Sequence, residues 1–193
     1  MFMRTLLIHS WVPMGNLRII LILAWTFKLL VLEVTFTLLK LKTNFIYPPY
    51  SLSPDEKKLF CEVLKGVKFP DDYASDIGHN VHVNERKVFG LKSHECHIVL
   101  QHLLPLAVRK VLPEVVSAAV IRVSHFFKKI CASVFRKSDM DSLEAEISET
   151  LSLLETIFLP SFFGIMVHLM VHLPAQARLA GLVHFRSMWP VER

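Results

Sequence analysis

The strongest constraint on the fold is a pair of long segments in which apolar residues recur at every third or fourth position. In the first segment, which Pro113 opens, these residues are Val116, Val120, Val123, Phe127, Ile130 and Val134. In the second, which follows the capping sequence Ser138-Asp-Met-Asp141, they are Met140, Leu143, Ile147, Leu151, Leu154 and Phe158. Because an α-helix repeats every 3.6 residues, this spacing puts each set on one helical face. The two segments are therefore predicted to pack antiparallel through these faces.

Shorter segments on the N-terminal side of this pair also carry helix signals. Ser53-Pro-Asp-Glu56 is a capping box with proline at the first helical position, and Gly66 supplies a helix end. These signals predict a helix over about 54–65, whose apolar face is made of Leu59, Phe60, Val63 and Leu64. Residues 69–90 contain proline, glycine and several Asp and Asn residues without a sustained period, which predicts a loop with at most a short hairpin around 81–88.

The C-terminal part continues the helical pattern. The segment 162–173 is apolar almost all round apart from His168 and His172, as expected for a helix at the centre of a bundle. Pro174 and Gly181 then bracket a short final helix. The chain after residue 44 is therefore predicted to be all-α, an irregular helical bundle with one loop or short hairpin.

The first 43 residues differ in composition from the remainder. Hydrophobic residues make up 52% of the chain, and their excess is concentrated in this part. Leu17–Leu39 approaches the length of ~20 apolar residues that is needed to cross a bilayer, but Lys28 and Glu33 lie near its middle. Each such charge costs roughly 2.5 to 3.5 kcal/mol on insertion. We predict a hydrophobic leader over 1–43 that contains an extra N-terminal helix, with a membrane span as the alternative.

The excess of basic residues favours an acidic partner, although these residues are not concentrated in one part of the sequence. The formal net charge of +5 is compatible with nucleic acid or a membrane surface as partner, but the basic residues are scattered. Around the segment that Pro113 opens, the residues that could contact phosphates are Arg109, Lys110, Arg122, Lys128, Lys129, Arg136 and Lys137. Phe126, Phe127 and Phe135 are interleaved with them, but their period fits a core stripe better than a base-stacking platform. A solvated basic face is the alternative to a DNA contact.

Ionisable side chains cluster at Ser93-His-Glu-Cys-His97. Ser93 is expected to cap a helix, which places the next four residues in the first turn. Two further histidines lie four residues apart on another helical face, so the candidate metal ligands are His94, His97, His168 and His172. The HExxH glutamate is absent, and no cysteine pair completes a tetrahedral site. We therefore predict no metal or other cofactor. We favour histidines that are buried in the fold, with their ring nitrogens hydrogen-bonded inside the domain and Glu95 as one such partner.

Cys96 could alternatively be a catalytic nucleophile. A helix N-terminus and a neighbouring imidazolium both lower the pKa of a thiol, which could make Cys96 a nucleophile. Adjacent helical residues point about 100° apart, however, so Cys96 and His97 do not easily act as nucleophile and base. Cys61 and Cys131 fall among apolar residues and are predicted to lie in the core. The three cysteines form no CxxC pair, so neither a disulfide framework nor a zinc knuckle is predicted.

Three longer motifs carry a resemblance to a known family. They are LKSHECHIVLQHLLP at 91–105, PSFFGIMVHLMVHL at 160–173 and the ending FRSMWPVER at 185–193. With these motifs the chain closely resembles the plant domain of unknown function 4218, which accompanies transposases of En/Spm (CACTA) elements. The resemblance covers about 47–193. The chain departs from the family pattern at Glu95 and at Gly164, because the family has aspartate at both positions.

The resemblance implies a domain division and a role for the end of the chain. Residues 1–43 lie outside it as a leader, and 44–193 correspond to a transposase-associated helical domain that is truncated at its C-terminus. In such elements the domain follows a DDE-type transposase core, and Glu192 would correspond to the last carboxylate of the acidic triad of that core. A two-metal site needs several carboxylates, so Glu192 alone implies no catalysis.

These observations together predict a transposon-derived domain without independent catalysis. Its ancestral role would be to support a DNA transposase in the nucleus, with the transposase or another protein, and DNA, as partners. The sequence identifies no small-molecule substrate. The first alternative is an interaction protein anchored in a membrane through Leu17–Leu39. The second is a metal-binding hydrolase that uses the histidine cluster.

Overall fold

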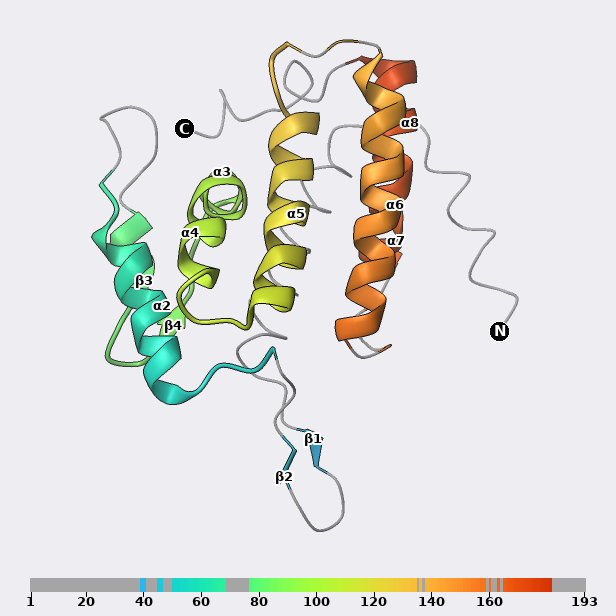
Figure 1. The fold of residues 1–193 in the computed structure, drawn as a ribbon. Coiled ribbons are helices and arrows are strands. Elements are labelled where there is room, and N and C mark those ends of the chain that lie inside the picture. The colour runs from blue at the N-terminus through green and yellow to red at the C-terminus, as the bar shows by residue number, and fades with distance from the viewer. Residues whose placement is uncertain are drawn as a thin grey trace.

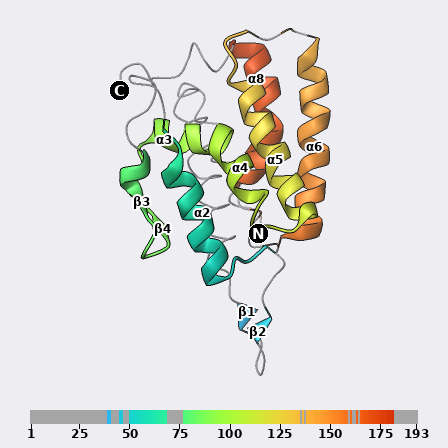
Figure 2. The same ribbon diagram turned by 60° about the vertical axis from the view of Figure 1, so that its left-hand side comes forward.

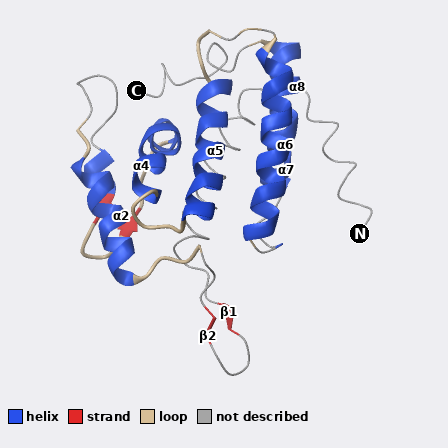
Figure 3. Ribbon diagram, viewed as in Figure 1, coloured by secondary structure: helices blue, strands red, loops and turns tan. Residues whose placement is uncertain are grey.

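The computed structural model describes residues 39–40, 45–46, 50–68, 77–134, 136, 138–158, 160, 163 and 165–181. Several predictions fall outside these residues: the N-terminal helix, the membrane span Leu17–Leu39 except for Leu39 itself, and the positions Phe135, Lys137, Gly164 and Glu192. Among the described helices, none combines the length and the apolar character that a bilayer span requires. The described part is built mainly from helices (Figure 3), which confirms the predicted all-α class.

The two predicted long helices form the centre of the fold. They are α5 (Glu114–Ile130) and α6 (Asp139–Ile157), which lie side by side and run antiparallel (Figures 1 and 2). Eleven of the twelve predicted stripe residues are buried. The exception is Val134, which is 83% exposed because α5 already ends at Ile130. Phe126 and Phe127 are fully buried, as the core-stripe interpretation predicted.

The capping box at the start of α2 (Pro54–Gly66) is present as predicted. The hydroxyl Oγ of Ser53 accepts from the Glu56 amide at 3.3 Å, and Glu56 Oε2 accepts from the Ser53 amide at 2.7 Å. The buried face differs from the predicted one, because Leu59 is 39% exposed and Cys61 is buried in its place. Helix α2 therefore presents Phe60, Cys61 and Leu64 to the core. This buried face is rotated about the helix axis relative to the predicted one.

The predicted short hairpin is also confirmed. A 3-10 turn, η1 (Ile77–Asn80), leads into the antiparallel strands β3 (Val81–His82) and β4 (Lys87–Val88). A second antiparallel pair, β1 (Leu39–Lys40) and β2 (Phe45–Ile46), was not predicted. Figure 2 shows the β3–β4 hairpin beside α2, on the opposite side of the molecule from α6.

The histidine-rich motif at 91–105 folds into one interrupted helical segment. It consists of α3 (Ser93–Ile98), the π-helical turn η2 (Val99–Leu103) and α4 (Leu104–Val108). Pro105 follows the π-helical turn and has no N–H group to continue a regular helical ladder. The segment contacts α5, which places the polar residues of α3 next to the core.

The last described helices are α7 (Ile165–His168), the 3-10 turn η4 (Leu169–His172) and α8 (Leu173–Ala180). The short final helix before Gly181 is therefore confirmed. The prediction that 162–173 lies at the bundle centre is wrong for the two histidines, because His168 and His172 are exposed. The residues of this segment that are buried in the core are Val167, Met170, Leu173 and Ala177.

Candidate functional site

The start of α3 is organised by a buried carboxylate. Glu95 is only 2% exposed, and its Oε2 atom accepts from the Lys92 amide at 2.9 Å and from Asn80 Nδ2 at 3.2 Å. The helix begins at Ser93 itself, and Lys92 occupies the N-cap position that was predicted for Ser93. Glu95 thus satisfies an amide at the helix start and ties α3 to the end of η1, which precedes the hairpin.

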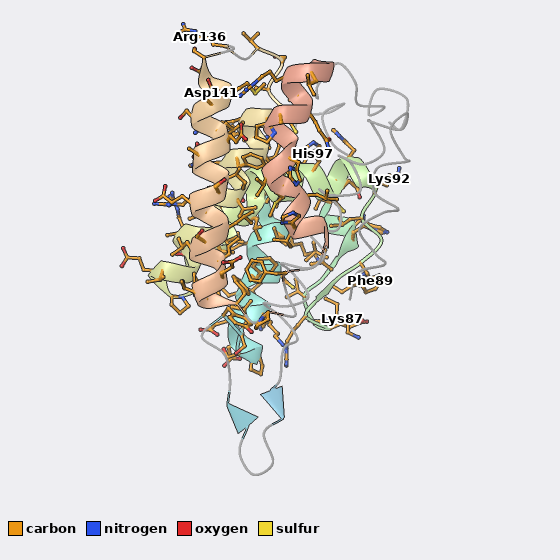
Figure 4. The ribbon with its side chains drawn as sticks, turned by 90° about the vertical axis from the view of Figure 1, so that its right-hand side faces the viewer. Lys87, Phe89, Lys92, His97, Arg136 and Asp141 are labelled. Carbon is orange, nitrogen blue, oxygen red and sulfur yellow. The ribbon has the colours of Figure 1, made fainter. Side chains whose placement is uncertain are left out.

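His97 forms the second part of the site. Its ring is 4% exposed, and its Nδ1 atom lies 2.8 Å from Nε2 of Gln101, one turn further along the segment. The same Gln101 nitrogen donates to the Phe127 carbonyl of α5 at 3.4 Å, and the Gln101 side chain also hydrogen-bonds to Cys131. Figure 4 shows His97 within the body of the helices. The glutamine, which the sequence prediction did not include, therefore links the histidine to the C-terminal end of α5.

Burial lowers the pKa values of two histidine rings in this region. Burial lowers the pKa of His97 to about 3, and repulsion from His94 and His102 adds to this effect. The ring is therefore uncharged at pH 7 and supplies no imidazolium to its neighbours. Burial and, to a smaller extent, repulsion from Lys128 also lower the pKa of His102.

The pKa of the Cys96 thiol is shifted in the direction opposite to the one that a nucleophile needs. Burial raises its pKa to about 11, and the Glu95 carboxylate adds to the increase. Its Sγ atom lies 4.0 Å from the Leu91 carbonyl oxygen. Burial also raises the pKa of Cys131 to about 12 and that of Cys61 above its usual range. The hypothesis of an activated Cys96 thiolate is therefore wrong, and the two other thiols are buried as predicted.

The four candidate metal ligands do not assemble into one site. His94 and His97 belong to α3, whereas His168 and His172 form a separate exposed pair, with ring centroids 5.3 Å apart and ring planes at 78°. Within the described ranges, no three His, Cys, Asp or Glu residues are placed to hold a metal ion. Of the four, only His97 is buried; His94 is half-buried, and His168 and His172 are exposed. The prediction of buried scaffold histidines therefore holds for His97 and fails for the exposed pair.

The predicted basic face is partly neutralised from within the domain. Arg122 pairs with Glu149 at 3.4 Å, and Lys129 pairs with Glu146 at 2.6 Å, both across the α5–α6 interface. In the part of the chain that the structure describes, the basic residues of the predicted set that form no ion pair are Arg109, Lys110, Lys128 and Arg136. The charge available to phosphates is therefore smaller than the sequence count indicates, and it lies at both ends of α5.

Comparison with known proteins extends the description of the C-terminal part. Residues 130–193 match a family model described as "Domain of unknown function (DUF4218)". The matched segment contains α6, α7, η4 and α8, but neither the motif at 91–105 nor the β3–β4 hairpin. No curated protein and no solved structure was found to match the chain. The chain is thus similar to the domain of unknown function 4218 over residues 130–193.

Proposed function

We propose that this chain is a transposon-derived helical domain that supports a DNA transposase in the nucleus and catalyses no reaction on its own. The family match over 130–193 and the resemblance of the motifs at 91–105 and 160–173 to the transposase-associated domain support this assignment. The same resemblance is the basis for a plant CACTA element as the source.

The observation that carries the non-catalytic part of the proposal is the internal use of the polar residues of α3. Glu95 accepts from Lys92 and Asn80, and His97 lies against Gln101, which in turn contacts α5. Both side chains are almost fully buried, and the Cys96 thiol stays protonated at pH 7 because its pKa is raised to about 11. A group that is satisfied inside the domain stabilises the fold but does not reach a substrate.

The exposed side of α5 is the surface that we assign to partner contact. Its C-terminal half carries His125, Lys128 and Lys129, and Lys128 forms no ion pair with a described carboxylate. An unpaired cation on a rigid helix can contact an acidic protein surface or a DNA phosphate without breaking an internal interaction. Arg136, which follows α5, extends the same charge beyond the helix end.

The proposal can be tested with the purified full chain and the catalytic core of an intact CACTA-type transposase. We expect a complex on size-exclusion chromatography with light scattering, and we expect Lys128→Glu to weaken it at least severalfold. The matched control is Lys58→Glu, because Lys58 is exposed on α2 and pairs with Glu62 at 3.9 Å. Absence of any complex, together with genomic sequence upstream that contains no trace of a transposase core, would overturn the proposal.

Direct DNA contact through α5 can be tested separately, by measuring the affinity of the chain for duplex DNA at several salt concentrations. Affinity for duplex DNA should fall steeply with salt, and Lys128→Ala should reduce the slope of log affinity against log salt by about 0.9. Lys129→Ala should have a smaller effect, because this ammonium is already paired with Glu146. An affinity that neither substitution changes would assign support of the transposase to protein contacts alone.

A further inference from the structure

The outer face of the β3–β4 hairpin presents an aromatic pair to solvent. Val81 pairs with Val88, and Val81 is buried against the core, so the alternation of side chains turns the next pair, His82 and Lys87, outward. The Phe89 amide donates to the Asn80 carbonyl at 3.2 Å, which continues the pairing by one residue beyond β4. Phe89 therefore lies on the same outward face as His82 and Lys87.

The phenyl ring of Phe89 is held in a defined orientation. It stacks on the imidazole of His82 with ring centroids 4.2 Å apart and an angle of only 4° between the ring planes. Phe89 nevertheless remains 52% exposed. A flat aromatic surface that is fixed on one side and open to solvent offers a place for a further planar ring to stack.

Cations flank this aromatic pair on both sides. Arg86 and Lys87 precede Phe89, and Lys92 follows it; all three are exposed, and none forms an ion pair with a described carboxylate. Figure 4 shows Lys87, Phe89 and Lys92 along one edge of the molecule. Glu85, on the same turn, is the neighbouring carboxylate and leaves the group with a net positive charge. We call Arg86, Lys87, Phe89 and Lys92 the hairpin surface.

Two further observations concern Arg86, at the tip of the hairpin. Burial and, second, repulsion from Arg86 lower the pKa of Lys57, so the ammonium of α2 and the guanidinium of the turn lie near each other. Arg86 itself has a φ of 56°, in the left-handed region that suits glycine, and its amide donates to the Val83 carbonyl at 3.2 Å. The turn thus carries an arginine where glycine would fit with less strain.

We propose that the hairpin surface binds single-stranded nucleic acid, with a base stacked on Phe89 and phosphates contacted by Arg86, Lys87 and Lys92. Cations interleaved with an exposed aromatic ring are the combination that holds a flexible strand, since every base has a π-face and every linkage a negative charge. Duplex DNA fits less well, because its bases are stacked on each other and expose only their edges. This inference goes beyond the transposase association, which does not require the hairpin.

The test measures fluorescence anisotropy of a labelled oligo-dT of about 12 nucleotides, a length within the usual range of site sizes, titrated with the full chain. Phe89→Ala should weaken binding roughly 5- to 150-fold, and Phe89→Trp should preserve it, because both aromatic side chains can stack. Lys87→Ala should reduce the slope of log affinity against log salt by about 0.7. The matched controls are Val134→Ala, another exposed apolar residue, and Lys65→Ala, an exposed lysine of α2 that forms no ion pair with a described carboxylate.

Arg86→Gly is a second binding test, whose result does not depend on whether Phe89→Ala folds correctly. Glycine relieves the left-handed φ, so this variant should unfold at the same or a higher temperature and still bind oligo-dT severalfold more weakly. Unchanged affinity in both Arg86→Gly and Phe89→Ala would overturn the proposal. It would also be overturned if a duplex of equal length bound as tightly as oligo-dT, or if a polyglutamate peptide bound with the same dependence on Phe89 while oligo-dT did not bind. Transposase-core association is measured as a protein complex, so failure of one proposal is distinguishable from failure of the other.

Discussion

Acid should destabilise this domain through His97. Its pKa is lowered to about 3 in the folded chain, mainly by burial, from an ordinary value of 6.5. Because the folded-state pKa is the lower one, the unfolded chain binds the extra proton as the pH falls. The stability contributed by the neutral ring is therefore complete above pH 6.5 and is lost as the pH falls toward 3. Integration between pH 7 and pH 4.5 gives a loss of roughly 2 to 3 kcal/mol in the free energy of unfolding.

The assay is urea unfolding of the full chain at several pH values between 7 and 4.5, followed by far-ultraviolet circular dichroism. His97→Gln removes the titration but keeps an amide oxygen that can accept from Gln101. Subtracting the variant's free energy of unfolding from that of the native chain cancels the carboxylates common to both. This difference should shift by roughly 2 to 3 kcal/mol in favour of the variant at the lower pH. His125→Gln, at an exposed position of α5, is the control for the substitution itself. A native-minus-variant difference that stays constant from pH 7 to pH 4.5 would refute this reasoning.

Three further predictions concern the fold. Ser53→Ala removes the acceptor of the Glu56 amide and should cost about 1 kcal/mol in urea unfolding, whereas Ser133→Ala, at an exposed position, should cost far less. Phe127→Ala should cost roughly 3 to 5 kcal/mol, because the ring is fully buried, and Val134→Ala should stay within about 0.5 kcal/mol. The three thiols should react slowly with a disulfide reagent at pH 7 and rapidly in urea; one fast-reacting thiol in the native chain would contradict their raised pKa values.

The parts of the fold that were predictable from sequence depend on local interactions. The capping box at Ser53 involves residues three positions apart, and the stripes of α5 and α6 depend only on the helical repeat. The misplaced residues lie where local signals leave a choice. Leu59 and Cys61 are both apolar, and packing against the rest of the core selects Cys61. Val134 continues the period of α5, but the helix ends at Ile130 before reaching it.

The candidate site depends on tertiary contacts, and the corresponding predictions were less complete. Gln101 carries no motif of its own, and its role appears only because its amide meets His97 on one side and Phe127 on the other. His168 is exposed because Val167 and Met170 face the core, and a run that is apolar almost all round does not indicate which face turns inward. The contact between Gln101 and Phe127 joins segments far apart in the chain, which residue spacing does not reveal.

The buried and the exposed polar groups of this domain are physically connected through Asn80. Its side chain donates to the buried carboxylate of Glu95, and its backbone carbonyl accepts from the Phe89 amide. Gly90, with φ of +80°, makes the turn between Phe89 and α3, and a Cβ added there would lie 3.3 Å from Asn80 Oδ1. The glutamate therefore orders the strand end on which Phe89 lies. Glu95 and His97 thus serve as scaffold, and the contacts of Glu95 hold in place the surface where we expect nucleic acid to bind.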